Sequence, residues 1–418
     1  MNYMDSNLFI SIRDGVEFYY FGNGCIADYY GESIAYLDDD DVSLIMLCDG
    51  IETILDYIKK INIISNNNDI IKNKIENMRR KGVLIINNKP QKCKAKFYGE
   101  RGMFYPKRLA IEITSSCNFR CPFCYKDANA FGNYITDDII DNIIETINGN
   151  VGLVTFTGGE PTIHPNFVKY IEQFSDKTPH ITMITNGSKL YKYSQYTSTL
   201  QKLDYIQFSM YGRDDDEYKI MTGDERGFTH LQRSVEFAKN NDIGVRLSLT
   251  LSNRTIHFIK EFVEAAKTIN PDELLIGFVD NYGRGKYEDA SEFLAEQKNA
   301  MKIINCLRRN NKDTIRIREA YQAKMHGYKK DNNDINENVY RGALFCGAGS
   351  EELVISSSGK IRPCHYLPED IFSVQSSNAL FEHIHGDFHI AQLNKAVEMY
   401  LEMRKADNYE PCRGMNMY

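Results

Sequence analysis

The chain has 418 residues, of which 42% are hydrophobic and 26% charged, as in an ordinary soluble globular protein. Its formal net charge of −7 makes it a poor candidate for non-specific nucleic-acid binding. No apolar run approaches the roughly 20 residues of a membrane span, and the N-terminus lacks the pattern of a signal peptide, so the sequence predicts a cytoplasmic protein without membrane or nucleic-acid partners.

Residues 1–88 are predicted to form a small α+β unit. Apolar and polar residues alternate over 7–37, which predicts short strands separated by turns at DG and GNG. Two segments, 41–61 and 68–86, then carry apolar residues at the three- and four-residue spacing typical of helices. Residues 89–108 are polar and basic, and are predicted to be a linker.

Strands and helices alternate from residue 109 to residue 285, which predicts parallel β-α-β units. Six such units fit, too few for a closed eight-fold barrel, so we expect an α/β fold with a partial (β/α)6, TIM-like barrel. Sites in such folds lie at the carboxyl ends of the strands. Residues 286–340 are predicted to be a bridging helix and loop, and 341–418 a small C-terminal unit.

Three of the ten cysteines, Cys117, Cys121 and Cys124, directly follow the first strand of this array. Clustered cysteines in a reducing compartment more often bind metal or carry redox chemistry than form disulfides. A structural zinc site needs a fourth ligand, and the next histidine along the chain is His164. Three thiolates on a four-iron cluster would instead leave one iron open to a small molecule. Spacing alone leaves both metals possible.

The segment CNFRCPFC (117–124) has the C-x3-C-x2-C form and resembles the radical S-adenosylmethionine (SAM) superfamily. The resemblance implies a [4Fe–4S] cluster held by the three cysteines, whose open iron is chelated by the methionine group of SAM. It also implies that SAM is cleaved reductively to a 5′-deoxyadenosyl radical, which abstracts hydrogen from the substrate. An electron donor such as flavodoxin or ferredoxin is then an expected partner.

Further motifs of that superfamily end the following strands: TGGEPT (157–162), ITNGS (184–188) and FSMYG (208–212). In relatives the GGE motif contacts the methionine amine, a charge-assisted contact for a carboxylate. The resemblance implies SAM-binding roles for Phe123, Gly158, Gly159, Glu160, Thr185, Asn186 and Ser209. The chain departs from many relatives at Thr222, where they carry an arginine before the glycine. Arg226 lies nearby, so the partner of the SAM carboxylate stays open.

The C-terminal unit contains a second set of cysteines around a predicted hairpin, ELVISSSGKIRPC (352–364). The order Cys346, Gly359, Cys364 resembles the opening of SPASM and twitch domains, and only Cys412 remains in the tail. The resemblance implies one auxiliary iron–sulfur cluster, of the [4Fe–4S] type, held by these three cysteines. Its fourth ligand stays open among another cysteine (Cys93 or Cys306), His365 and the substrate. Free or zinc-binding cysteines are the alternative.

The N-terminal unit, with strands, an LCDG turn and then helices, resembles the winged-helix RiPP recognition element. Such a unit binds the leader of a ribosomally made peptide by adding it to a strand edge, which tethers the distant core peptide near the reactive site. The alternative is a stabilising domain without a ligand.

Together the three modules resemble sactipeptide and ranthipeptide thioether maturases. The resemblance implies a radical SAM enzyme that acts on a precursor peptide and forms a thioether or another cross-link. One alternative is a peptide epimerase, for which Cys306 is a candidate hydrogen donor. Others are a protein-modifying enzyme similar to anaerobic sulfatase-maturing enzymes, an enzyme of small-molecule metabolism, and a binding protein that kept a cluster.

Overall fold

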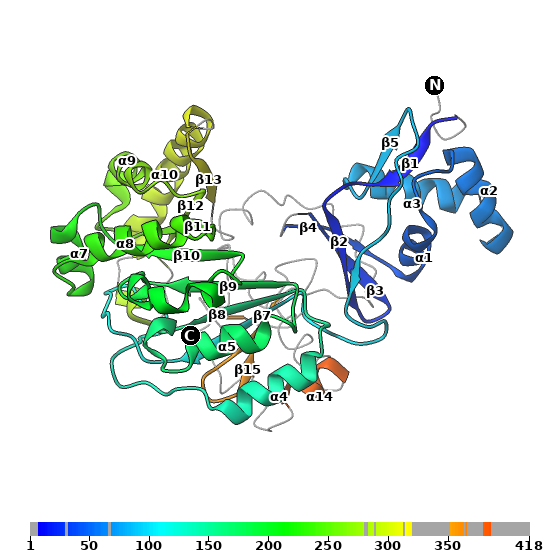
Figure 1. Cartoon of the computed structure of the whole chain (residues 1–418). Helices are drawn as coiled ribbons and strands as arrows, with labels where there is room; N and C mark the ends of the chain where they lie inside the picture. The colour runs from blue at the N-terminus through cyan, green and yellow to red at the C-terminus, as the bar shows by residue number, and fades with distance from the viewer. Residues whose placement is uncertain are drawn as a thin grey trace.

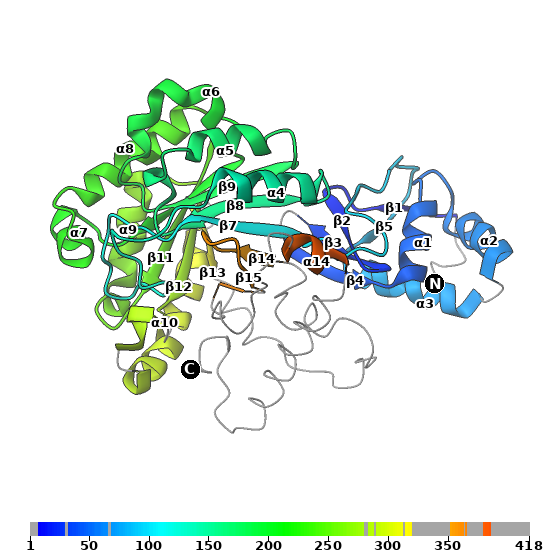
Figure 2. The ribbon, with the colours of Figure 1, turned by 90° about the horizontal axis from the view of Figure 1, so that it is seen from below.

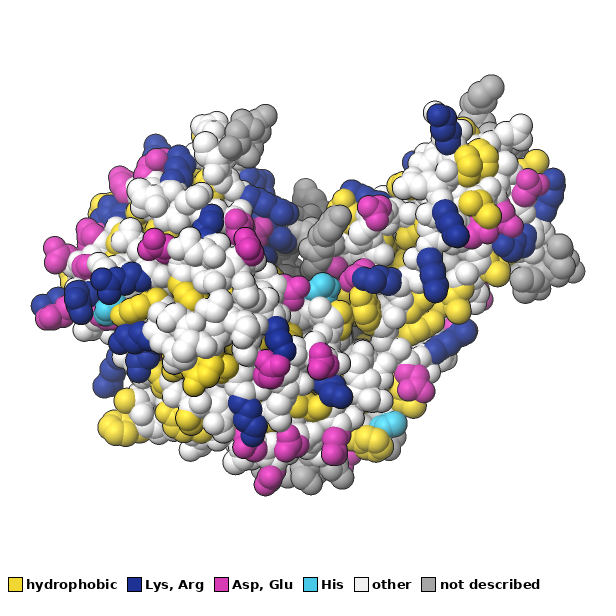
Figure 3. All heavy atoms as spheres, viewed as in Figure 1, with side chains coloured by type: hydrophobic (Ala, Val, Ile, Leu, Met, Phe, Trp, Pro, Cys, Tyr) yellow, Lys and Arg dark blue, Asp and Glu magenta, His cyan; other side chains and the backbone are white. Residues whose placement is uncertain are grey.

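The structure is a computed structural model, and it describes residues 7–29, 32–65, 68–279, 283–287, 290–311, 314–319, 352–362, 364–365 and 379–385. An N-terminal unit and a larger α/β core are visible as two lobes in Figure 1. Acidic and basic side chains are interspersed over the face of both lobes seen in Figure 3. Within the described residues, no helix is long and apolar enough to cross a membrane.

The N-terminal unit contains two small sheets and three helices. Its strands are β1 (Phe9–Ile12), β2 (Val16–Phe21), β3 (Gly24–Tyr29), β4 (Glu32–Leu37), β5 (Leu84–Asn87) and β6 (Phe97–Tyr98). Its helices are α1 (Asp39–Leu47), α2 (Ile54–Ser65) and α3 (Asn68–Arg80). β1 pairs with β5, and the larger sheet has the order β4-β3-β2-β6, so β4 is an edge strand of that sheet. Helices and sheets enclose a hydrophobic core of their own, with Phe18, Ile45 and Tyr57 fully buried.

Three local features of residues 7–108 differ from the sequence predictions. The helix predicted over 68–86 ends at Arg80, and Leu84–Asn87 forms strand β5 instead. The helix predicted over 41–61 is interrupted between α1 and α2, because Gly50 has a positive φ of 80° and a Cβ there would lie 1.8 Å from the Gln91 carbonyl oxygen. The segment predicted to be a linker contributes β6, which pairs in parallel with β2. Its sequence KCKAKF alternates lysines with Cys93, Ala95 and Phe97, which pack against the N-terminal core as alternate residues of a strand do.

The α/β core is built on parallel strands, and its fold class agrees with the prediction. Six of them are β7 (Arg108–Thr114), β8 (Leu153–Gly158), β9 (His180–Thr185), β10 (Tyr205–Met210), β11 (Gly244–Leu251) and β12 (Glu273–Phe278). Each is hydrogen-bonded in parallel to the next along the chain. β13 (Arg316–Glu319) extends the sheet beyond β12 in the same direction, so the segment predicted to be a bridging helix and loop also contributes a strand to the core.

The connections between these strands are mostly helical. The α-helices are α4 (Asp137–Ile147), α5 (Phe167–Phe174), α6 (Thr197–Leu200), α7 (Asp215–Thr222), α8 (Gly227–Asn240), α9 (Ile259–Ile269) and α10 (Ala290–Asn310). Short 3-10 turns lie at η2 (Pro161–Ile163), η3 (Leu190–Tyr196), η4 (Ile256–Phe258) and η5 (Gly283–Tyr287). Figure 2 shows α4, α5 and α8 along one face of the sheet. Thr136 caps α4 through its side chain, as its sequence position indicates.

The C-terminal hairpin completes the sheet at its other edge. β14 (Glu352–Ile355) pairs in parallel with β7 and antiparallel with β15 (Ile361–Arg362), and the turn between them contains Gly359 at a φ of 78°. The resulting order is β13-β12-β11-β10-β9-β8-β7-β14-β15, nine strands within the described residues. A short helix, α14 (Ala379–His385), lies near α4 (Figure 2).

The two faces of this sheet differ in polarity. In β11 every second residue, from Val245 to Leu251, is buried in the helix-covered core, while the intervening Arg246, Ser248 and Thr250 are only half-buried. β10 shows the same alternation, with Gln207 on the second face. Parallel sheets are usually covered on both faces and their strands are apolar throughout. The polar face therefore indicates an interior surface suited to a ligand.

Candidate active site

The three cysteines of the C-x3-C-x2-C motif lie on the loop that follows β7, called the cysteine loop (115–135) below. Cys121 is buried, and Cys117 and Cys124 are half-buried. The loop returns along its own beginning, where the Cys117 amide donates to the Asn129 carbonyl oxygen (2.8 Å). The Phe119 amide also approaches the Cys117 sulfur, at 3.4 Å.

The cysteines influence one another electrostatically. Burial raises the pKa of the Cys117 thiol to about 12, and negative charge on Glu160 and Cys124 acts in the same direction. Burial also raises the pKa of Cys121, with further contributions from Cys124 and Cys117. Because metals bind thiolates, metal binding here would release protons.

The donor set fits a cluster better than a single ion. Among the residues that the structure describes, no three His, Cys, Asp or Glu side chains converge closely enough to hold one metal ion. A zinc site of the predicted alternative needs that convergence. A [4Fe–4S] cluster does not, because each thiolate binds a different iron atom.

Gly158 and Gly159 bring the end of β8 against the start of the cysteine loop. A Cβ at Gly158, whose φ is 131°, would lie 2.1 Å from the Thr114 carbonyl oxygen, and one at Gly159 would lie 2.0 Å from that of Ser116. The Gly159 amide donates to Thr114 (2.7 Å) and the Glu160 amide to Ser116 (2.9 Å). Only glycine permits this approach of two backbones.

Glu160 is completely buried beside the cysteine loop, and so it is not the surface residue that a chance occurrence of the motif would give. Its Oε1 accepts hydrogen bonds from the Thr162 amide (3.0 Å), the Thr162 hydroxyl (2.6 Å) and the Thr185 hydroxyl (2.6 Å). Its Oε2 accepts one from the Asn186 amide (2.6 Å). Burial raises the pKa of Glu160, and these donors oppose the rise. Oε2 accepts a single hydrogen bond from the described residues and so keeps acceptor capacity for an ammonium group.

Asn186, at the end of β9, links the TNG motif to the cysteine loop. Its Nδ2 donates to Asn118 Oδ1 (3.0 Å) and lies 3.9 Å from the Cys117 sulfur. Its Oδ1 accepts from the Ser188 amide (2.9 Å), which fixes the orientation of the side chain. Asn186 therefore contacts both Glu160, through its backbone, and the cysteine motif.

The remaining predicted SAM contacts lie around an aromatic group. Phe123 is buried, and its ring centroid lies 5.9 Å from that of Tyr211. Ser209 lies half-buried on the polar face of β10. Hydrogen bonding with the Tyr211 side chain lowers the pKa of Cys121, against the stronger effect of burial. Tyr211 is a contact that the sequence motif did not assign.

Neither candidate partner of the SAM carboxylate is singled out by the structure. The Thr222 hydroxyl donates to the Tyr218 carbonyl oxygen (2.7 Å) within α7, and its own carbonyl accepts from the Arg120 amide (3.5 Å). Arg226 is exposed at the start of α8, where its amide donates to Asp224 (2.9 Å). Thr222 therefore supports the backbone of the cysteine loop.

Arg284, in η5 after β12, is a site residue that the sequence reasoning missed. Its Nε donates to the Cys121 carbonyl oxygen (2.8 Å), and its amide donates to that of Cys124 (2.9 Å). The guanidinium also binds Asp127 (2.6 Å). Gly283 allows this contact, because a Cβ there would lie 2.3 Å from the Tyr125 carbonyl oxygen. The Gly-Arg-Gly sequence in the turn after β12 was the feature of the sequence that could have pointed to Arg284.

The second set of cysteines is only partly described. Cys364 lies half-buried directly after β15, whereas Cys346 and Cys412 lie outside the described residues. Of the suggested fourth ligands, Cys306 is exposed on α10, and Cys93 lies in the N-terminal unit, where its thiol donates to the Cys48 carbonyl oxygen (3.6 Å). His365 adjoins Cys364 and contacts Glu112 of β7 (3.3 Å).

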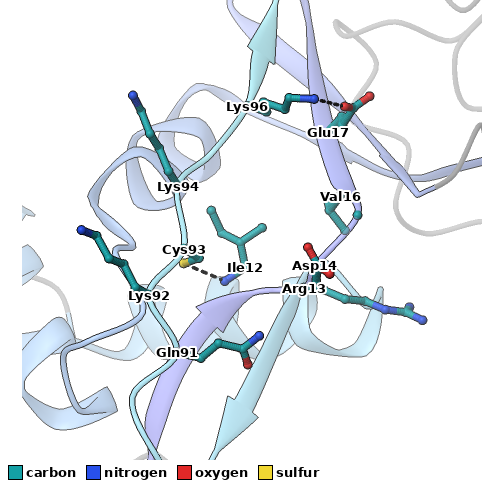
Figure 4. Close-up of a pocket in the computed structure, with 11 residues that line it drawn as sticks. Ile12, Arg13, Asp14, Val16, Glu17, Gln91, Lys92, Cys93, Lys94 and Lys96 are labelled. Atoms are coloured by element: carbon teal, nitrogen blue, oxygen red, sulfur yellow. Dashed lines mark hydrogen bonds and ion pairs between the residues drawn. The ribbon is translucent and has the colours of Figure 1, made fainter.

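A cavity of about 410 Å³ lies in the N-terminal unit between the turn after β1 and the segment before β6. Figure 4 shows Cys93 directed toward Ile12, whose amide donates to the Cys93 sulfur (3.3 Å). Lys92 and Lys94 lie on the opposite side of their segment, and Lys96 pairs with Glu17 (2.7 Å). The rim of this cavity is therefore rich in positive charge.

Comparisons with known proteins agree with the motifs found at this site. Residues 111–269 match the sequence model of the Radical SAM superfamily. The chain is 21% identical over 298 residues to the antilisterial bacteriocin subtilosin biosynthesis protein AlbA of Bacillus subtilis (strain 168), covering 70% of this chain and 62% of that protein. It thus spans less than two thirds of that relative's length. It is also 26% identical over 278 residues to a probable GTP 3′,8-cyclase of Saccharolobus islandicus (strain M.14.25 / Kamchatka #1), covering 64% of this chain and 85% of that protein.

Solved structures share the fold at low sequence identity. Streptococcus suis SuiB bound to S-adenosylmethionine superposes with a TM-score of 0.64 at 13% identity, covering 97% of this chain and 100% of SuiB. SuiB bound to its precursor peptide SuiA gives a TM-score of 0.60 at 14% identity, covering 98% and 100%. Native anSMEcpe with bound AdoMet and the Cp18Cys peptide gives 0.53 at 16% identity, covering 73% and 87%.

Proposed function

We propose that this chain, whose residues 111–269 form a domain of the radical SAM superfamily, is an enzyme that modifies a ribosomally made precursor peptide. The domain implies a [4Fe–4S] cluster and SAM, which together supply, on one-electron reduction, a 5′-deoxyadenosyl radical able to abstract hydrogen from a substrate. The electron would come from a donor such as flavodoxin or ferredoxin.

The chain's own residues would hold and orient these groups. Cys117, Cys121 and Cys124 would each bind one iron and leave the fourth open. Glu160, kept in place by hydroxyl and amide donors, would accept the methionine ammonium at Oε2. Asn186 would keep Glu160 and the cysteine loop in register. The buried Glu160 beside the cysteines is the observation that carries this part of the proposal.

The N-terminal unit supports a peptide as the substrate. Among the described residues, β4 has no strand paired on its outer side, and such an edge suits an added peptide strand. Lys92 and Lys94 have no acidic partner among the described residues and could attract an acidic segment of a leader. A small-molecule enzyme, by contrast, needs no such unit. The likeness to SuiB extends over 97% of the chain, and so includes this unit as well as the core.

We further propose one auxiliary iron–sulfur cluster bound by Cys364 together with Cys346 and Cys412. An anaerobically reconstituted chain should then contain about eight iron atoms, from two four-iron clusters. A chain that retains only about four after reconstitution would contradict the auxiliary cluster and leave the radical SAM cluster unaffected.

The proposed activity is tested with the full chain under anaerobic conditions. With SAM and a strong reductant, 5′-deoxyadenosine should form, and the variant Cys121→Ala should form none. The absence of 5′-deoxyadenosine from the wild-type chain at full iron content would contradict the proposal and favour a binding protein.

The bond formed is tested with a short peptide encoded beside the gene. Loss of two hydrogens, measured by mass spectrometry, would support a thioether or another cross-link. An unchanged mass with one deuterium gained in heavy water would indicate epimerisation instead. Lys92→Glu/Lys94→Glu should weaken binding of that peptide, whereas Lys59→Glu/Lys81→Glu, a matched change on exposed lysines of the same unit, should not.

A further inference from the structure

A buried group of charged side chains lies between the cysteine loop and the C-terminal hairpin. We call it the Glu112 network, after its members Glu112 of β7, Lys126 of the cysteine loop, Arg362 of β15, and His365. The ammonium of Lys126 and the guanidinium of Arg362 both contact Oε1 of Glu112, and His365 Nδ1 lies 3.3 Å from the same atom. The side chains of Glu112 and Arg362 are 6% and 9% exposed, so the contacts form away from water.

Lys126, Arg362 and His365 all contact the same carboxylate, that of Glu112, which is therefore shared by three side chains. Burial by itself would raise the pKa of Glu112, but Lys126, His365 and Arg362 outweigh that effect and hold it well below its usual range. Charges in the interior are tolerated when they are paired, and removal of a carboxylate that several side chains share is strongly destabilising. Glu112 is therefore the member on which the network depends.

The network joins parts of the chain that are far apart in sequence. Glu112 and Arg362 are separated by 250 positions. The His365 ring packs edge-on against Tyr125, with centroids 6.3 Å apart, and its Nε2 lies 3.5 Å from Glu352 of β14. Since Tyr125 follows Cys124 directly, the network contacts the end of the cysteine motif on one side and the hairpin on the other.

We propose that Glu112 is a positioning residue that couples the cysteine loop to the hairpin carrying Cys364. Through Lys126 it fixes the exit of the loop after Cys124, and through Arg362 and His365 it fixes the hairpin on the edge of β7. The placement of one cysteine-bearing segment then depends on the other. This inference rests on the proposed function for its effect on a cluster, whereas the coupling itself is a property of the polypeptide.

Hydrogen exchange measured by mass spectrometry on the full chain without metal tests the coupling directly. In Glu112→Gln, amide exchange should accelerate at least about tenfold in both residues 121–128 and residues 352–362. The matched control is Lys107→Met, which breaks another buried ion pair, with Asp28 of the N-terminal unit, just before the same strand. It should accelerate exchange near its own position and leave the two segments unchanged. Acceleration of only one segment in Glu112→Gln, or equal acceleration in the control, would overturn the proposal.

A second variant distinguishes a local effect on the two segments from a general loss of folding. Arg362→Met removes one cation and leaves Glu112 paired with Lys126 and His365. The hairpin should exchange faster, with a smaller change in the loop. Glu112→Asp retains the charge and should restore much of the protection in both segments. Failure of the aspartate to restore any protection, with the overall fold intact, would count against an electrostatic role.

Reconstituted protein gives an independent readout. In Glu112→Gln the exit of the cysteine loop is no longer held through Lys126, so iron bound at Cys117, Cys121 and Cys124 should be lost faster to a chelator than in the wild type. An unchanged rate of iron loss together with unchanged exchange would refute the inference. If the wild-type chain binds no cluster at Cys117, Cys121 and Cys124, the proposed function fails, and the exchange experiment on the metal-free chain still decides the coupling.

Discussion

Glu112 on β7 and Glu160, two residues after the end of the neighbouring strand β8, are both buried carboxylates, and their surroundings are opposite. Glu160 is held by two hydroxyls and two backbone amides, all of them neutral. Glu112 is held by Lys126, Arg362 and His365. Their pKa values accordingly move in opposite directions, upward for Glu160 and downward for Glu112. Neutral donors leave the negative charge of a carboxylate available to an incoming cation, whereas cationic neighbours already compensate that charge. This difference supports the proposed roles, binding for Glu160 and positioning for Glu112.

The largest effect on stability is expected at Glu112. Glu112→Gln removes the carboxylate that Lys126, Arg362 and His365 share, which should lower the free energy of unfolding by about 3–5 kcal/mol. Chemical denaturation of the metal-free chain measures this loss. A loss below about 1 kcal/mol would mean that the surrounding cations are compensated in another way, and the contrast with Glu160 would weaken.

Glu160→Gln should mainly affect SAM. Loss of the charged contact to the methionine ammonium should weaken SAM binding about 100-fold, since hydrogen bonds to charged groups contribute about 1.5–3 kcal/mol. Equilibrium binding to the reconstituted chain provides the measurement, and iron content should stay at the wild-type level. Loss of iron at unchanged SAM affinity would instead assign Glu160 to the support of the cysteine loop.

Arg284→Met should have an intermediate effect on the cysteine loop. The substitution removes hydrogen bonds to the Cys121 carbonyl and to Asp127, which should cost about 1–3 kcal/mol in the local order of the loop. Iron should then be lost faster to a chelator, with SAM contacts at β8 and β9 intact. A chelation rate equal to that of the wild type would show that the Glu112 network alone holds the loop exit.

Asp137→Asn should have the smallest effect. Asp137 also has several partners, among them Lys169 and Tyr170, but its side chain is 44% exposed. Exposed ion pairs contribute about 1 kcal/mol or less. Stability should change within that limit, and 5′-deoxyadenosine formation should stay at the wild-type rate. A large change in stability would indicate that burial does not explain why Glu112 and Glu160 contribute more than an exposed carboxylate.

Much of the architecture follows from local sequence patterns. The alternation of strand and helix from residue 109 onward predicted the parallel sheet, and turn residues predicted the hairpin at Gly359. Both signals are local, because hydrophobic period and turn chemistry act over a few residues. The strand β6 was missed because the lysines of the preceding segment, KCKAK, resemble a polar linker unless the residues between them are considered.

The site residues also differ in whether a local sequence pattern could predict them. The cysteine motif and GGE are short and contiguous, so they could be found in one sequence. Arg284 and the Glu112 network could not, because they arise from contacts between distant segments, 163 positions apart for Arg284 and Cys121. A lone glutamate within the apolar strand LAIEIT was a signal, since a charge at such a position requires partners, but the sequence does not name them.

The pairing of β14 with β7 has a consequence for the order of assembly. β7 is the first strand of the core to leave the ribosome, and its neighbour on that side, β14, belongs to a hairpin synthesised about 250 residues later. Until that hairpin is synthesised, β7 lacks this neighbour at the edge where Glu112 lies. Uncovered edges invite pairing with other chains. A charge at this place disfavours pairing with an apolar strand of another chain. It favours pairing with the hairpin, which carries Arg362, so Glu112 would protect the nascent chain from misassembly.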